Sequence, residues 1–130
     1  MTTSSDSAAT APRAPRESDI ERYLVRRVRE CFGAAALCRK VTWQGRRSAP
    51  DRVVMFRAPA DAIETRGFTV WVELKRPGEK PTRAQSAEHM RLAEAGQLVR
   101  VLDSKEAVDD FLRHLYYAAP PHYRIKSVLP

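Results

Sequence analysis

Three side chains of this 130-residue chain have types and a spacing that suit the chemistry of phosphate esters. Asp51 follows Pro50 and opens an apolar run, while Glu73 and Lys75 lie at the end of a second apolar run. Two carboxylates can hold a hard divalent cation that keeps several of its waters. A nearby amine can orient or deprotonate one of these waters, or neutralise charge on a phosphate. The set therefore points to metal-assisted hydrolysis of a phosphodiester.

Strand geometry explains how Glu73 and Lys75 can act together. The run from Phe68 to Leu74 is rich in β-branched and aromatic residues, and the side chains of a strand alternate between its two faces. Glu73 and Lys75 therefore share one face and lie about 6–7 Å apart along the strand. The same triplet also occurs as an ion pair on solvated strands, and Pro-Asp commonly opens a turn. Because both acids border apolar runs in this chain, the catalytic interpretation is favoured.

Hydrophobic periodicity predicts the elements that would position these residues. Apolar residues recur at three- and four-residue spacing in the first segment, and Arg22, Arg26 and Arg29 lie on its opposite side. Glycine and proline separate the later segments. The expected order is α-β-β-β-α-β-α, with helices over residues 16–32, 82–95 and 104–115 and strands over residues 37–43, 51–56, 68–74 and 98–102.

The same residues resemble the core of a known nuclease superfamily. Pro50-Asp51 followed by Glu73-Leu74-Lys75 has the order of the PD-(D/E)XK motif, and the resemblance is closer to one branch, the stand-alone phage and bacterial VRR-NUC domains. It implies an α/β restriction-endonuclease-like core, with a mixed sheet and flanking helices. The resemblance runs from about Arg16 to about Leu115, in the segments Glu17-Ser18-Asp19-Ile20-Glu21, Pro50-Asp51-Arg52, Val72-Glu73-Leu74-Lys75-Arg76-Pro77-Gly78, Gln85 with His89, and Leu92 through Gly96.

The resemblance also implies an activity. The expected protein is a Mg²⁺- or Mn²⁺-dependent DNA endonuclease that prefers branched, flap or junction DNA, acts as a homodimer and needs no small-molecule cofactor. The implied metal ligands are Asp51, Glu73, the backbone carbonyl of Leu74 and an acid of the first helix, with Lys75 as a further catalytic residue. The alternatives are a non-cleaving nucleic-acid-binding module and a phage packaging or replication accessory protein of the same fold.

Two acids compete for the role in the first helix. Glu17 stands three residues before Ile20, which is the spacing of the early helical Glu in the family. Glu21 falls near the middle of the apolar face, where a carboxylate is costly unless a metal or a cation pairs with it. However, Ser18 and Glu21 also match a capping box, which would make Glu21 structural. We favour Glu17 and keep Glu21 as the alternative.

The helix after the Glu-x-Lys strand carries two further candidates. Gln85 either contacts the metal-bound water or the scissile phosphate, or closes a capping box with Thr82. Both interpretations remain open at this point. His89 lies one turn further along the same helix face, where a lone histidine is more often structural than catalytic.

Positive charge is concentrated in one part of the chain. The net charge is +7, and residues 13–57 hold twelve Lys or Arg against five Asp or Glu, a balance of +7. This excess favours a polyanionic partner such as DNA, although it also fits a merely solvated basic face. Trp43 either stacks on a base or packs in an interface or core. The expected contacts to DNA phosphates are Arg39, Lys40, Arg46, Arg47 and Arg76.

Other sequence features exclude some classes of protein. Cys31 and Cys38 form no Cys-x-x-Cys or Cys/His group, which argues against a zinc site. There is no long apolar run and no signal-peptide segment, so a cytoplasmic protein without membrane contact is expected. The family resemblance implies that it is of bacterial or phage origin. The expected organisation is a flexible arm over residues 1–15, a nuclease domain over residues 16–115 and a tail over residues 116–130.

Overall fold

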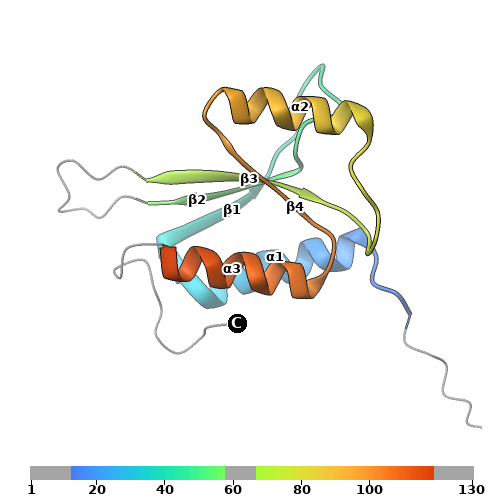
Figure 1. The fold of residues 1–130 in the computed structure, drawn as a ribbon. Helices are drawn as coiled ribbons and strands as arrows, with labels where there is room; N and C mark the ends of the chain where they lie inside the picture. Colours follow the sequence, from blue (N-terminus) through green and yellow to red (C-terminus); the bar gives the residue numbers. More distant parts are fainter. Residues whose placement is uncertain (1–12, 58–66, 119–130) are drawn as a thin grey trace, which may run out of the picture.

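One mixed sheet of four strands organises the fold (Figure 1). The computed structural model describes residues 13–57 and 67–118. The strands lie in the order β1-β2-β3-β4, antiparallel except for the parallel pair of β3 and β4. The predicted order of helices and strands is confirmed, with a short 3₁₀ helix added after the first helix. The elements are α1 (Glu17–Phe32), η1 (Gly33–Ala35), β1 (Ala36–Lys40), β2 (Arg52–Phe56), β3 (Phe68–Leu74), α2 (Arg83–Glu94), β4 (Leu98–Leu102) and α3 (Lys105–Ala118).

The register between β2 and β3 brings the two acids of the motif together. Arg52 pairs with Val72 in this antiparallel ladder, so the next positions outward are Asp51 and Glu73. Residues opposite one another in such a ladder point to the same face, with Cβ atoms about 4.5–5.5 Å apart. The strand pairing alone therefore places two carboxyl groups side by side at one end of the sheet.

The helices cover the two faces of the sheet unequally (Figure 1). α1 and α3 lie on one face and α2 lies on the other. The apolar stripe of α1 recurs every three or four residues, as a helix that faces a core requires. Truncating a core leucine such as Leu24 to alanine should cost about 2–5 kcal/mol. The core on this side includes Ile20, Leu24, Val28, Phe32, Val54, Phe56, Val70, Val72, Leu74, Val108 and Leu112.

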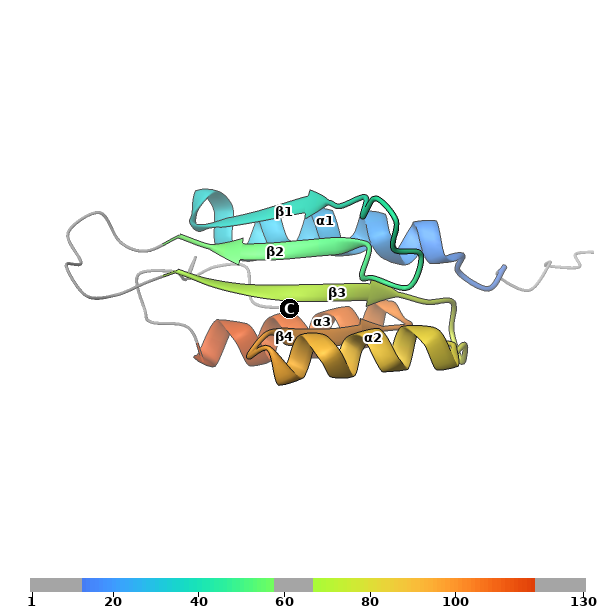
Figure 2. The same cartoon turned by 90° about the horizontal axis from the view of Figure 1, so that it is seen from above.

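The helices share a direction that matters for an anionic ligand. α1, α2 and α3 each begin at the end of the molecule where β3 ends, as Figures 1 and 2 show. The start of a helix carries partial positive charge from its unpaired N–H groups. The end of the sheet that holds Asp51 and Glu73 is therefore the end at which an anion is electrostatically favoured.

The start of α1 differs from the sequence prediction. The helix begins at Glu17, and the backbone N–H of Arg16 donates to Oδ2 of Asp19 at 2.9 Å. The predicted capping box between Ser18 and Glu21 is therefore wrong. Asp19 lies closer to the helix start and takes the capping role, which leaves Glu21 to make contacts elsewhere.

Two other element ends also differ from prediction. β1 ends at Lys40 instead of Trp43, because the chain turns there and the Trp43 ring folds back over the sheet. α3 continues to Ala118, and Tyr116 is buried with its ring centroid 6.1 Å from that of Phe32. The last helix is thus longer than the predicted range of residues 104–115. The remaining expectations for the arm and the tail, over residues 1–12 and 119–130, lie outside the described residues.

No helix in the described part of the chain has the length and apolar composition needed to cross a membrane.

Candidate active site

Asp51 and Glu73 form a close pair of carboxyl groups at the end of the sheet. The Glu73 side chain is only 3% exposed. Burial, and then the charge and hydrogen bond of the neighbouring Asp51, raise the pKa of Glu73 to about 8. Near neutral pH, the two carboxyl groups therefore share a proton. A proton held between two carboxyl groups occupies a position at which a cation is favoured.

The turn before β2 fixes the position of Asp51. The indole N–H of Trp43 donates to the carbonyl of Pro50 at 2.9 Å, and the backbone N–H of Val41 donates to the carbonyl of Asp51 at 2.9 Å. The Trp43 ring also packs against Trp71, with ring centroids 5.1 Å apart. Of the two interpretations of Trp43, these contacts support packing. The two hydrogen bonds fix the carbonyl groups of Pro50 and Asp51.

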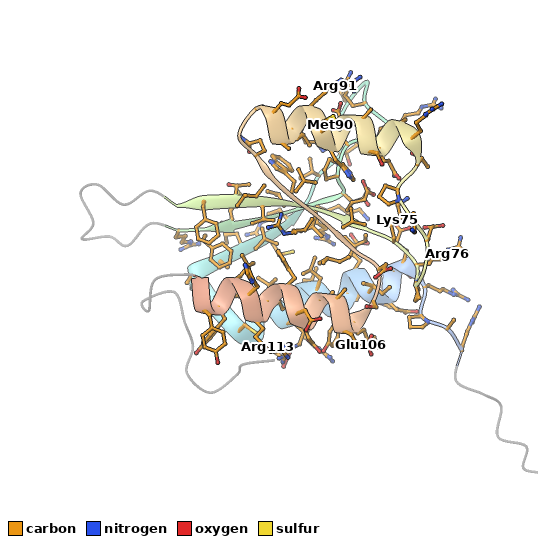
Figure 3. All side chains as sticks on the ribbon, viewed as in Figure 1. Lys75, Arg76, Met90, Arg91, Glu106 and Arg113 are labelled. Atoms are coloured by element: carbon orange, nitrogen blue, oxygen red, sulfur yellow. The ribbon has the colours of Figure 1, made fainter. Side chains whose placement is uncertain are left out.

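Lys75 lies at the end of β3 and is only 7% exposed. Its backbone N–H donates to the carbonyl of Leu102 at 3.0 Å, so the chain is still held beside β4 at this point. The ammonium charge of Lys75 lowers the pKa of Glu73, against the larger effect of burial, and also lowers the pKa of His89. Figure 3 shows Lys75 and Arg76 together at this end of the molecule.

A glycine turn returns the chain from β3 to α2. The backbone N–H of Glu79 donates to the carbonyl of Arg76 at 3.0 Å, and Gly78 has a φ of +80°. A side chain at this φ would be strained, so the Pro77-Gly78 pair suits a tight turn at this position. The turn allows α2 to lie over the sheet face that carries Glu73.

Glu17 and Glu21 occupy different environments. Burial and then the charge of Asp51 raise the pKa of Glu17, which places this carboxyl group near the pair at the strand ends. Glu21 instead accepts a hydrogen bond from Nε of Arg52 at 2.7 Å, and lies 3.5 Å from Nζ of Lys40. Arg52 follows Asp51 in the chain and points to the opposite face of the sheet, as strand alternation predicts.

The helix α2 contributes one side chain to the pair. Nε2 of His89 lies 3.3 Å from Oε1 of Glu73, and burial, with the charge of Lys75, lowers the pKa of His89. Gln85 forms the predicted capping box, because its side-chain oxygen accepts the backbone N–H of Thr82 at 2.9 Å. The sequence placed His89 on the same face as Gln85, but only the packing of α2 on the sheet brings its ring to Glu73.

The donor set fits a hard divalent cation. Within residues 13–57 and 67–118, no three His, Cys, Asp or Glu side chains lie close enough together to enclose an ion. Mg²⁺ is usually bound by one or two carboxylates, with waters and substrate oxygens completing its coordination. Asp51 and Glu73 supply that number of carboxylates. The raised pKa of Glu73 shows that two negative charges are unfavourable here, and a bound cation would offset them.

The basic residues predicted to bind DNA fall into two groups. Arg46 and Lys40 are already paired. Two nitrogens of Arg46 contact Glu88, at 2.6 and 3.3 Å, and Lys40 pairs with Glu21. The side chains of the second group are exposed, and this group comprises Arg39, Arg47 and Arg76.

Comparisons with known proteins agree with this geometry. The mixed sheet, its covering helices and the carboxyl pair at the strand ends define an α/β nuclease. No family model matches the chain. It is 43% identical over 91 residues to "Putative nuclease p44" of Acyrthosiphon pisum secondary endosymbiont phage 1, across 70% of this chain and 86% of that protein. A solved structure described as "VRR_NUC domain" superimposes with a TM-score of 0.64 at 32% identity, over 79% of this chain and 100% of that one. The chain belongs to the VRR-NUC family of nucleases, as its motifs predict.

Proposed function

We propose that this nuclease is a Mg²⁺- or Mn²⁺-dependent DNA endonuclease, with Asp51, Glu73 and Lys75 as its catalytic residues. The observation that carries the proposal is the buried pair of Asp51 and Glu73 at the strand ends, in which Glu73 has a pKa of about 8. Such a pair costs free energy as two anions and is relieved by a divalent cation. Membership in a nuclease family supports the same conclusion.

Each residue has a distinct role in this proposal. Asp51, Glu73 and the backbone carbonyl of Leu74 would hold the ion. Glu17 of α1 would act as the further acid through one of the waters that the ion keeps. When bound, the ion supplies a water of lowered pKa and a positive charge beside the phosphate. Lys75 neutralises the charge that develops on the scissile phosphate and orients the attacking water.

Two residues of α2 complete the proposed site. His89, at 3.3 Å from Glu73, holds the orientation of that carboxylate. Gln85 is the weaker candidate because its side-chain oxygen is engaged by Thr82, although its amide nitrogen can still face a phosphate oxygen.

The charge around the site supports DNA as the substrate. The exposed side chains of Arg39, Arg47 and Arg76 are the proposed phosphate contacts, with Lys40 and Arg46 in support. Contacts to phosphates position DNA without reading its sequence. The family resemblance supports a preference for branched, flap or junction DNA, which the enzyme would select by the shape of the DNA and not by its sequence.

We also propose that two copies act together. One domain of this size carries one carboxyl pair and covers little DNA, so cutting both strands of a junction requires a second site. Light scattering on the purified protein at several concentrations, with and without junction DNA, tests for the homodimer.

A cleavage assay tests the proposal directly. Purified protein is incubated with Mg²⁺ or Mn²⁺ and linear, flap, splayed or four-way DNA. Asp51→Asn and Glu73→Gln should each reduce the cutting rate at least ~10²-fold, comparable to removal of another single electrostatic contribution. The matched control is Glu106→Gln, the same chemical change at an exposed position of α3 (Figure 3). Cutting by Asp51→Asn at the wild-type rate excludes this site, and a wild-type protein that binds DNA but never cuts it indicates a binding module.

A further inference from the structure

A pocket on the outer side of α1 gathers positive charge. It has a volume of about 350 Å³ and is lined by Arg13, Arg22 and Arg26, and by Lys105 from α3. Asp19 is the one acid among the described residues that line it, so four cations face one anion, a balance of +3. The positive charges repel one another at short range, and an anion bound among them would offset this repulsion.

The pocket has a fixed wall between the two helices. The Arg26 guanidinium lies 5.3 Å and the Lys105 ammonium 5.6 Å from the centroid of the same Tyr23 ring. The Tyr23 hydroxyl donates to both carboxylate oxygens of Asp109, at 2.7 and 2.9 Å, which holds the ring in place. Nε of Arg26 also lies 3.6 Å from Glu30. Cation–π contacts position the two cations without consuming their N–H donors, and those donors are what a phosphate oxygen accepts.

The pocket lies toward the same end of the molecule as the candidate active site. Glu17 and Arg22 belong to the same helix, and five residues of helix span about 7.5 Å along its axis. α1 and α3 both begin at the end of the molecule that carries Lys75 and Arg76 (Figures 1 and 3). A DNA strand that crosses the strand ends and passes around the start of α1 would thus reach the pocket, with successive bases about 3.4 Å apart.

We propose that this pocket is a second phosphate-binding site, which holds the DNA backbone a few nucleotides from the bond that is cut. The proposal rests on the proposed function as a DNA nuclease. Arg and Lys side chains form charge-assisted hydrogen bonds to phosphate oxygens, and Arg can form two at once. The pocket would hold the flanking arm of the substrate in position and carry no sequence preference.

The test compares two double variants that each remove one charge from α1 and one from α3. Arg22→Gln with Lys105→Gln changes the pocket, whereas Arg29→Gln with Arg113→Gln changes two cations outside its lining. Binding of a duplex about two helical turns long is measured by fluorescence anisotropy at several salt concentrations, with Ca²⁺ replacing Mg²⁺ to prevent cutting. The pocket variant is expected to fold. Lys105 lies in the first turn of α3, where the helix macrodipole disfavours a cation, so its replacement removes no stabilising charge. Arg22→Gln breaks the ion pair of Arg22 with Asp19 at 2.6 Å, but Arg22 is 78% exposed and such surface pairs contribute little to stability.

Each phosphate contact contributes about −0.9 to the slope of log affinity against log salt. The pocket variant should therefore flatten the slope by up to about two units, and the control variant should leave it unchanged. Equal slopes for both variants overturn the proposal, because the effect is then one of net charge alone. A second outcome also overturns the proposal: inorganic phosphate stabilises the wild type against heat but not the pocket variant, and the DNA slope is the same for both. The pocket then binds free phosphate and not DNA. Wild-type protein that binds DNA and does not cut it contradicts the proposed nuclease function alone.

Discussion

At the residue scale, the site depends on a carboxyl group that is disfavoured as an anion. Glu73 is buried, lies beside Asp51 and contacts His89, so its charged form lacks the solvation that a surface carboxylate enjoys. The nearby Lys75 offsets only part of this cost. The proposed cation would have to replace the proton on this group, so metal binding should depend on pH.

The first prediction concerns this coupling. Without metal, folded Glu73 keeps its proton up to a pKa of about 8, while the unfolded chain releases it near 4.5. Between these values the folded state binds more protons than the unfolded chain. The stability that Glu73 contributes is therefore complete below pH 4.5 and is lost as pH rises through 8. Between pH 7 and 8, where His89 is largely neutral in both states, the free energy of unfolding should fall by about 1 kcal/mol.

Urea denaturation in EDTA measures this effect. Glu73→Gln should abolish the decline, because it removes the titrating group. Added Mg²⁺ should reverse the decline in the wild type, since the cation binds the deprotonated carboxylate. A wild-type stability that is flat across this interval contradicts the assignment of a shared proton.

The second prediction separates the two acids of α1. Glu17→Gln should reduce metal-dependent cutting with little change in stability, because Glu17 faces the carboxyl pair. Glu21→Gln should lower the free energy of unfolding by about 1–2 kcal/mol, because the charged partner of the largely buried Arg52 is lost. Cutting rates and denaturation curves of the two variants check this. Loss of cutting in Glu21→Gln, with none in Glu17→Gln, reverses the assignment.

At the element scale, polar contacts join α2 to the rest of the fold. Along its described length it buries only Glu88. This carboxylate accepts from Arg46 of the loop before β2 and from Arg91 one turn further along the helix. Because α2 also carries His89 to Glu73, its attachment should influence the site.

The third prediction tests this attachment. Arg46→Gln removes the link between the loop and α2, so hydrogen exchange should become faster in both segments and cutting should slow. Arg91→Gln is the matched control, because it removes a partner of the same carboxylate from within the helix. Hydrogen exchange measured by mass spectrometry should show loop opening only in Arg46→Gln. Equal exchange in both variants means that apolar packing alone holds α2.

Local sequence patterns predict this fold better than they predict its contacts. The bounds of β3 and β4 and the cap of α2 at Thr82 follow from residue alternation and from neighbouring residues, so they are readable directly. The contacts of Arg46 with Glu88 and of His89 with Glu73 depend on how α2 lies across the sheet, which no local pattern contains. The pair of Asp51 and Glu73 is an intermediate case. It needs only the register of two adjacent strands, and the motif order indicated it.

At the scale of the whole molecule, the positive charge of the chain and the positive ends of the helix dipoles both favour an anion near the carboxyl pair. The net charge of +7 is carried by residues 13–57, and the helices begin where the carboxyl pair lies. The two acids thus sit in a positive setting, which would favour the proposed DNA substrate and still leave the carboxyl pair for the proposed cation.

The fourth prediction follows from that arrangement. Arg47→Gln with Arg76→Gln removes two exposed cations that lie close in sequence to Asp51 and Glu73. The change should flatten the salt dependence of DNA binding in Ca²⁺ by up to about two units. The loss should be equal for duplexes of unrelated sequence, because phosphate contacts do not read bases. The control is Arg57→Gln with Arg100→Gln, which removes the same charge from the far end of β2 and from β4. If the control flattens the slope as much as the first pair, DNA is attracted by net charge alone. If neither changes it, the backbone of the DNA lies on another face of the molecule.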